Sequence, residues 1–138
     1  MIEALYDVSP AWPVIIAGLL AAAFPFHTAR KGLALIAPVL ALGLWFNAPS
    51  GDHVGGLIEL GGFTMETFRF DGLSRIWGLI FIIAAFINGL YGLHEKDRIA
   101  DAAGLIYAGA GLGAVFAGDL LSLFVFWELT AISSVFLI

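Results

Sequence analysis

The sequence predicts an all-α integral membrane protein with about five transmembrane helices, and its composition is the main reason. Hydrophobic residues make up 61% of the chain, charged residues make up only 12%, and the mean hydropathy is +0.99. Soluble domains carry about 25% charged residues. Because one helical span of a bilayer needs about 20 apolar residues, we expect about five spans in a single transmembrane domain over residues 1–138.

The N-terminal part of the sequence predicts two helices separated by a basic loop. The first helix is expected over residues 10–27, with Ser9 placed to cap its first turn. Arg30 and Lys31 are expected in the loop, and the second helix is predicted over residues 32–46.

The longest connection, residues 47–70, carries a candidate β-hairpin. It begins with turn-forming residues, and Gly61 and Gly62 precede a stretch, residues 63–70, in which hydrophobic and polar side chains roughly alternate. We expect a short hairpin in the outer loop, between the second and third helices.

Three further helices follow. They are predicted over residues 71–93, with Asp71 as the N-cap, over residues 99–117, and over residues 120–138 after a tight turn at Asp119. Small residues spaced four apart let another helix approach closely, and hydroxyl groups bond to neighbouring helices or to their own backbone. On this ground we assign helix packing to Gly109, Gly113, Ala117, Ser133 and Ser134.

The distribution of basic residues predicts an orientation. They follow the first and third helices, as Arg30, Lys31, Lys96 and Arg98, whereas the N-terminal segment has none. The positive-inside rule therefore places these loops in the cytoplasm and the N-terminus outside, which means the periplasm for a chain of a bacterial inner membrane.

Several classes of site are not expected. The chain has no cysteine, so it has neither disulfides nor thiolate metal sites, and its three histidines share no metal-ligand spacing. Its six basic residues are scattered, which argues against nucleic-acid binding. We predict no cofactor and no metal.

Glu128 is the residue most indicative of function. It follows Asp119 by nine residues, which at about 1.5 Å per residue places it about 14 Å along a helix, near the middle of a bilayer core. An ionisable group there costs about 2.5–3.5 kcal/mol, so it usually lines a proton or ion path or bonds between helices. Both interpretations stay open. We expect its cationic partner to come from another polypeptide.

Three aspartates have two interpretations each. Asp119 is interpreted as the cap of the last helix, with a role at a channel mouth as the alternative. Asp71 is likewise interpreted first as a cap. Asp101, near the cytoplasmic end of the fourth helix, is interpreted as a solvated helix end or as an aid to proton entry.

Two segments carry a resemblance to a known family. Asp-Gly-Leu-Ser at 71–74, and residues 119–138 with Phe-Trp-Glu-Leu-Thr at 126–130 and a following Ser-Ser pair, resemble the antiporter-like subunits. That family comprises the large subunits of Mrp sodium/proton antiporters, the proton-pumping membrane subunits of complex I, and related subunits of membrane-bound hydrogenases. The resemblance implies that Glu128 matches the family's glutamate on the fifth helix, which pairs with a lysine on the seventh.

The expected function follows from this resemblance. We expect a subunit of a multi-subunit monovalent cation (sodium)/proton antiporter, with other membrane subunits, the bilayer, protons and sodium as partners. The chain stops at Ile138 without a charged residue, so we expect the N-terminal part of a larger or split subunit, with a complete small protein as the alternative. The alternatives for function are a proton-pumping subunit of an NADH-quinone oxidoreductase-like or hydrogenase complex, a non-catalytic scaffold, and a small homo-oligomeric channel.

Overall fold

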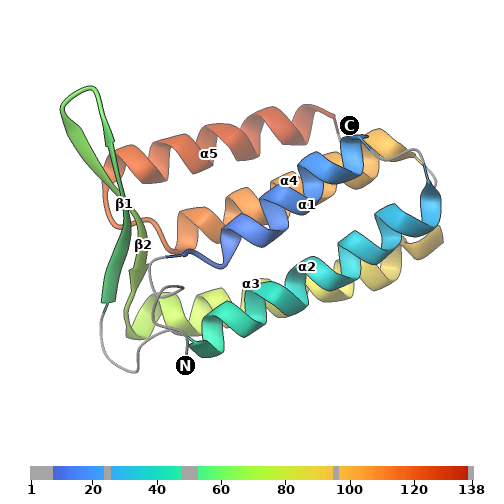
Figure 1. Cartoon of the computed structure of the whole chain (residues 1–138), viewed down its shortest axis with the longest axis horizontal. Helices are drawn as coiled ribbons and strands as arrows, with labels where there is room; N and C mark the ends of the chain where they lie inside the picture. Colours follow the sequence, from blue (N-terminus) through green and yellow to red (C-terminus); the bar gives the residue numbers. More distant parts are fainter. Residues whose placement is uncertain (1–7, 24–25, 48–52, 95–96, 137–138) are drawn as a thin grey trace.

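The computed structural model describes residues 8–23, 26–47, 53–94 and 97–136. In this part of the chain, five α-helices lie side by side and a two-stranded β-hairpin lies across one end of them (Figure 1). The prediction of five helices, with a hairpin between the second and third, is confirmed. The elements are α1 (Ala11–Ala23), α2 (His27–Asn47), β1 (His53–Leu60), β2 (Phe63–Phe70), α3 (Gly72–Tyr91), the 3-10 helix η2 (Gly92–His94), α4 (Arg98–Val115) and α5 (Leu120–Val135).

Two of these helices are long and apolar enough to cross a membrane. They are α2, over Thr28–Asn47, and α3, over Gly72–Tyr91. The helices over Ala11–Ala23, Ile99–Val115 and Leu120–Val135 are apolar but shorter. Length and composition therefore support two candidate spans among the described helices, which is fewer than the five predicted.

The junction between α1 and α2 differs from the prediction. Ser9 caps α1 as expected, since its side-chain oxygen accepts a hydrogen bond from the N–H of Ala11 at 3.3 Å. However, α2 begins at His27 rather than at residue 32, so Arg30 and Lys31 lie in its first turns and not in a loop. The two basic side chains are buried there because a carboxylate of α4 compensates their charge.

The centre of the molecule is formed by α4, which contacts all four other helices. Its closest neighbour is α1, and glycines on both helices permit this approach. A Cβ atom at Gly18 would lie 3.1 Å from the carbonyl oxygen of Ala102, and one at Gly109 would lie 2.9 Å from the backbone nitrogen of Ile15. Glycine at these positions thus lets the two backbones approach closely.

The hairpin turns at Gly61 and Gly62, whose φ values of 57° and 84° lie in the left-handed region. Leu60 pairs with Phe63 on either side of this turn, and β1 and β2 are antiparallel. Such two-residue turns require φ values that glycine adopts without a steric penalty.

Strand β2 is held against the helices by the turn between α4 and α5. The N–H of Arg69 donates to the carbonyl oxygen of Phe116 at 2.6 Å, and the N–H of Gly118 donates to that of Glu66 at 2.8 Å. Phe68 and Phe70 of β2 pack on Phe116, with ring centroids 5.4 and 5.9 Å from it. All three rings are buried, so this end of the helices is closed by an aromatic cluster.

Candidate functional site

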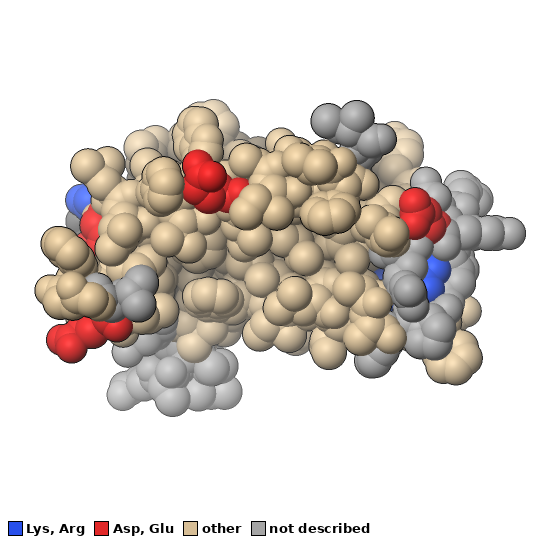
Figure 2. Space-filling view, turned by 90° about the horizontal axis from the view of Figure 1, so that it is seen from above, with Lys and Arg blue, Asp and Glu red and all other residues tan. Residues whose placement is uncertain are grey.

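Glu128 lies in the second half of α5, on the face that points away from the other helices. The described contacts of α5 are mainly with α4 and, at its start, with β2. Glu128 is exposed, and so are the large apolar side chains that share its face, Phe124, Trp127, Ile132 and Val135. Figure 2, which views the molecule from the side that carries α5, shows acidic atoms surrounded by uncharged surface, while other charges lie toward the two ends.

No residue in the described part of the chain forms a hydrogen bond or an ion pair with Glu128. The cationic side chains for which contacts are described bind elsewhere: Arg30 and Lys31 bind Asp101, Arg69 lies 3.4 Å from Asp71, and Arg75 stacks on Phe70. Each of these four cations thus has a described interaction away from Glu128.

The opposite face of α5 carries the hydroxyl groups, and these bond to their own helix. Thr130 donates to the carbonyl oxygen of Phe126 at 2.8 Å, and Ser133 donates to that of Leu129 at 2.9 Å. Ser134 donates to the carbonyl oxygen of Ala131 at 2.7 Å. Ser133 is buried, and the described hydrogen bonds of these three hydroxyls stay within α5.

Asp119 caps α5, as predicted, and also fixes the hairpin. One carboxylate oxygen accepts a hydrogen bond from the N–H of Ser122 at 2.7 Å, and the other accepts one from the N–H of Glu66 in β2 at 2.8 Å. Burial alone would raise the pKa of Asp119, but these N–H donors outweigh it and hold the pKa below its ordinary value of 3.8. Both oxygens are occupied by backbone groups, so the structural interpretation of Asp119 is supported.

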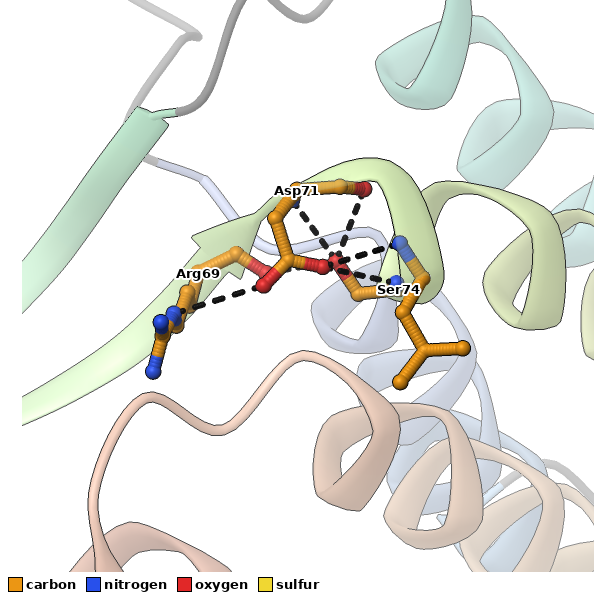
Figure 3. A network of polar contacts seen from close by, with 4 residues as sticks. Arg69, Asp71 and Ser74 are labelled. Carbon is orange, nitrogen blue, oxygen red and sulfur yellow. Dashed lines mark hydrogen bonds and ion pairs between the residues drawn. The ribbon is translucent and has the colours of Figure 1, made fainter.

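Asp71 is likewise a cap, and it forms a capping box with Ser74 at the start of α3 (Figure 3). Its side chain accepts hydrogen bonds from the N–H groups of Leu73 at 3.1 Å and Ser74 at 2.9 Å, and the Ser74 hydroxyl accepts one from the N–H of Asp71. The hydrogen bond from the Ser74 backbone is the main reason why the pKa of Asp71 is lowered. Arg69, at the end of β2, points toward the same carboxylate.

Asp101 is not a solvated helix end, and that interpretation was wrong. It lies in the first turn of α4, where Arg30 Nε donates to one carboxylate oxygen at 3.0 Å and Lys31 Nζ donates to the other. The side chains of all three residues are less than a tenth exposed. Two consecutive basic residues and an aspartate in a first helical turn were the available signal. It was missed because the basic pair was assigned to a loop.

The predicted packing ridge on α4 exists over two of its three positions. Gly109 faces α1, as described above, and a Cβ atom at Gly113 would lie 2.5 Å from the ring of Phe126 in α5. Ala117 lies beyond the last residue of α4, so it is not part of the ridge. Both glycines therefore serve contacts between helices of this chain.

With this geometry in place, the chain was compared with known proteins. No family model, curated protein or solved structure matches it.

Proposed function

We propose that this chain is a membrane-embedded subunit of a multi-subunit monovalent cation/proton antiporter, in which Glu128 takes part in proton transfer. The observation that carries the proposal is the placement of Glu128, an exposed carboxylate on the apolar outer face of α5 with no partner in the described residues. The likeness of residues 119–138 to antiporter-like subunits supports the same function.

The surface of the helices supports a membrane location. Large apolar side chains are exposed along α3 and α5, among them Leu73, Trp77, Leu120 and Phe124. Soluble monomers rarely expose apolar patches of more than a few hundred Å². A bilayer, together with neighbouring subunits, would cover these faces.

The chemistry of a carboxyl group in such a setting suits proton transfer. In a medium of low dielectric constant a carboxyl group holds its proton, and the approach of an ammonium group releases it. A lysine on a neighbouring helix that moves toward and away from Glu128 would load and unload this proton. A proton-pumping subunit of a redox-driven complex would use the same step, with a different source of energy.

A scaffold is the second candidate, because the apolar outer face of α5 is itself suited to docking another subunit. In that case Glu128 would be replaceable as long as the subunits assemble. Gly109 and Gly113 of α4 do not serve this role, since they pack against α1 and α5.

The replacement Glu128→Gln in the assembled complex separates these functions. We expect cation-driven proton movement in membrane vesicles to fall about 100-fold or more, the size typical of a positioned proton-transfer group. Glu59→Gln, the same change at an exposed position of the hairpin, is the matched control and should leave exchange unchanged. Normal exchange by the Glu128 variant, with co-purification of all subunits intact, would refute the proton role and leave the scaffold.

A further inference from the structure

A buried charge cluster lies between α2 and α4, at the end of the helices away from the hairpin. Arg30 and Lys31 share the single carboxylate of Asp101, and the exposed fractions of the three side chains are 5%, 9% and 7%. Together these groups carry one more positive than negative charge. Each oxygen of Asp101 accepts one of these hydrogen bonds.

The position of the two cations increases the local positive potential. Arg30 and Lys31 lie in the first turns of α2, where the unpaired N–H groups of a helix already place a partial positive charge. The N-terminus of α4 lies at the same end. Its N-cap, Asp97, is exposed and accepts a hydrogen bond from the N–H of Ile99. Asp97 and Asp101 balance the formal charges of Arg30 and Lys31, so the helix N-termini supply the remaining positive potential at this end.

A pocket of about 370 Å³ opens beside this cluster. Lys31 and Asp101 line it from one side, and Asn88 of α3 and Tyr107 of α4 add an amide and a hydroxyl group. In the described residues Lys31 uses one of its three N–H donors, on Asp101. Most of the remaining lining is alanine and glycine, and a Cβ atom at Gly104 would meet no atom within 4 Å. The pocket therefore combines hydrogen-bond donors and room, and Lys31 and Asp101 bring one positive and one negative charge to its lining.

We propose that this pocket binds the phosphate group of an anionic phospholipid. Lys31 would donate to the phosphate oxygens, and Asn88 and Tyr107 would add neutral donors. The apolar walls, built from α2, α3 and α4, would accept the glycerol and the first methylene groups. A lipid is favoured over a free anion because α2 and α3 are the helices long enough to span a bilayer, and the pocket lies where they begin and end. The proposal rests on the membrane location within the proposed function, but not on proton transfer by Glu128.

The test uses the purified chain in detergent after removal of bound lipid. Phosphatidylglycerol, phosphatidylcholine and inorganic phosphate are titrated separately, and bound lipid is counted by native mass spectrometry. We expect phosphatidylglycerol to bind more tightly than phosphatidylcholine. Lys31→Gln should weaken phosphatidylglycerol binding about tenfold, the loss expected for one hydrogen bond to a charged group.

A second variant keeps the charges and removes the space. Gly104→Leu fills the pocket and should weaken phosphatidylglycerol binding at least as much as Lys31→Gln, with the wild-type melting temperature retained. Gly111→Leu is its matched control, since Gly111 lies two turns further along α4, also has open space around it, and does not line the pocket. It should bind as the wild type does, and so should Glu128→Gln.

Two results would overturn the proposal. Equal binding of phosphatidylglycerol by all variants, or no preference over phosphatidylcholine, would mean unspecific lipid around the helices and would overturn the proposal. Inorganic phosphate binding as tightly as the lipid would assign the pocket to a free anion and would overturn it too. Loss of antiport in Glu128→Gln has no bearing on these outcomes, so failure of one proposal can be told from failure of the other.

Discussion

An acidic side chain has contrasting surroundings on the inner side of α4 and on the outer face of α5. Asp101 on α4 is buried and shares both oxygens with Arg30 and Lys31, which lie 71 and 70 residues earlier in the chain. Glu128 on α5 is exposed among apolar side chains, and the described residues provide it with no partner. The first carboxylate is satisfied within the fold, whereas the second depends on what surrounds the helix.

This contrast distinguishes a carboxylate that stabilises the fold from one that contributes little to it. A charge that is buried with its partners contributes to the folded state mainly by preventing a larger cost, since removal of one partner leaves the others uncompensated. An exposed charge on an apolar face contributes little to folding, and in the proposed membrane location it would cost about 2.5–3.5 kcal/mol, which would call for another purpose. The buried inner side of α4 and the exposed outer face of α5 should therefore respond differently to substitution, with the largest loss of stability on α4.

The largest effect is expected at Asp101. Asp101→Asn removes the charge that Arg30 and Lys31 share, and should lower the free energy of unfolding by about 3–5 kcal/mol, as for a broken buried ion pair. The same change of chemistry at Glu128, Glu128→Gln, should alter it by less than about 0.5 kcal/mol. Denaturant unfolding in detergent measures both. Equal losses at the two positions would contradict the distinction drawn here.

A smaller loss is expected where α4 meets α1. In Gly109→Val the new side chain would meet the backbone of α1 near Ile15, and overpacking of this kind costs about 1–3 kcal/mol. Gly111→Val on the same helix is the control, because a Cβ atom there meets nothing within 4 Å. The difference in melting temperature between the two variants gives the result. If both melt alike, α1 and α4 do not pack as closely as the structure shows.

Sequence patterns captured the local features of this fold and missed one that joins distant segments. The helices, the hairpin turn at Gly61 and Gly62, and the caps Asp71 and Asp119 are each encoded within a few residues, so periodicity and cap chemistry predicted them. The pairing of Arg30 and Lys31 with Asp101 joins residues 71 and 70 positions apart, and the sequence shows these residue types but not that the fold brings them together.

The glycines of α4 show a second limit of sequence patterns. The spacing of Gly109 and Gly113 correctly predicted close helix packing, but it left open which helix each one meets. The structure places α1 against one and α5 against the other. A glycine in the sequence shows only that another helix has room to approach. Which helix approaches depends on the whole arrangement of helices.

Asp119, at the start of α5, should make a modest contribution to stability that depends on pH. Asp119 accepts hydrogen bonds from both Ser122 and Glu66, and its pKa in the folded protein is below the ordinary value of 3.8. A carboxyl group with a lowered folded pKa stabilises the fold above its unfolded pKa, and this stabilisation is lost as the pH falls through the folded value. The free energy of unfolding should therefore decrease as the pH is lowered below about 4.

Asp119→Asn should remove part of this pH dependence. Asparagine keeps one oxygen to cap α5 but presents an NH₂ group where Glu66 N–H needs an acceptor, so near neutral pH the variant should be about 1 kcal/mol less stable. The difference from the wild type should shrink as the pH falls, because the protonated wild-type carboxyl loses the same hydrogen bond. Asp71→Asn provides the comparison, since Asp71 has the same direction of pKa shift but accepts its backbone hydrogen bonds from α3 and meets β2 only through the side chain of Arg69 among the described residues. A stability difference that stays constant from neutral pH to about pH 3 would show that the link between Asp119 and the hairpin does not depend on its charge.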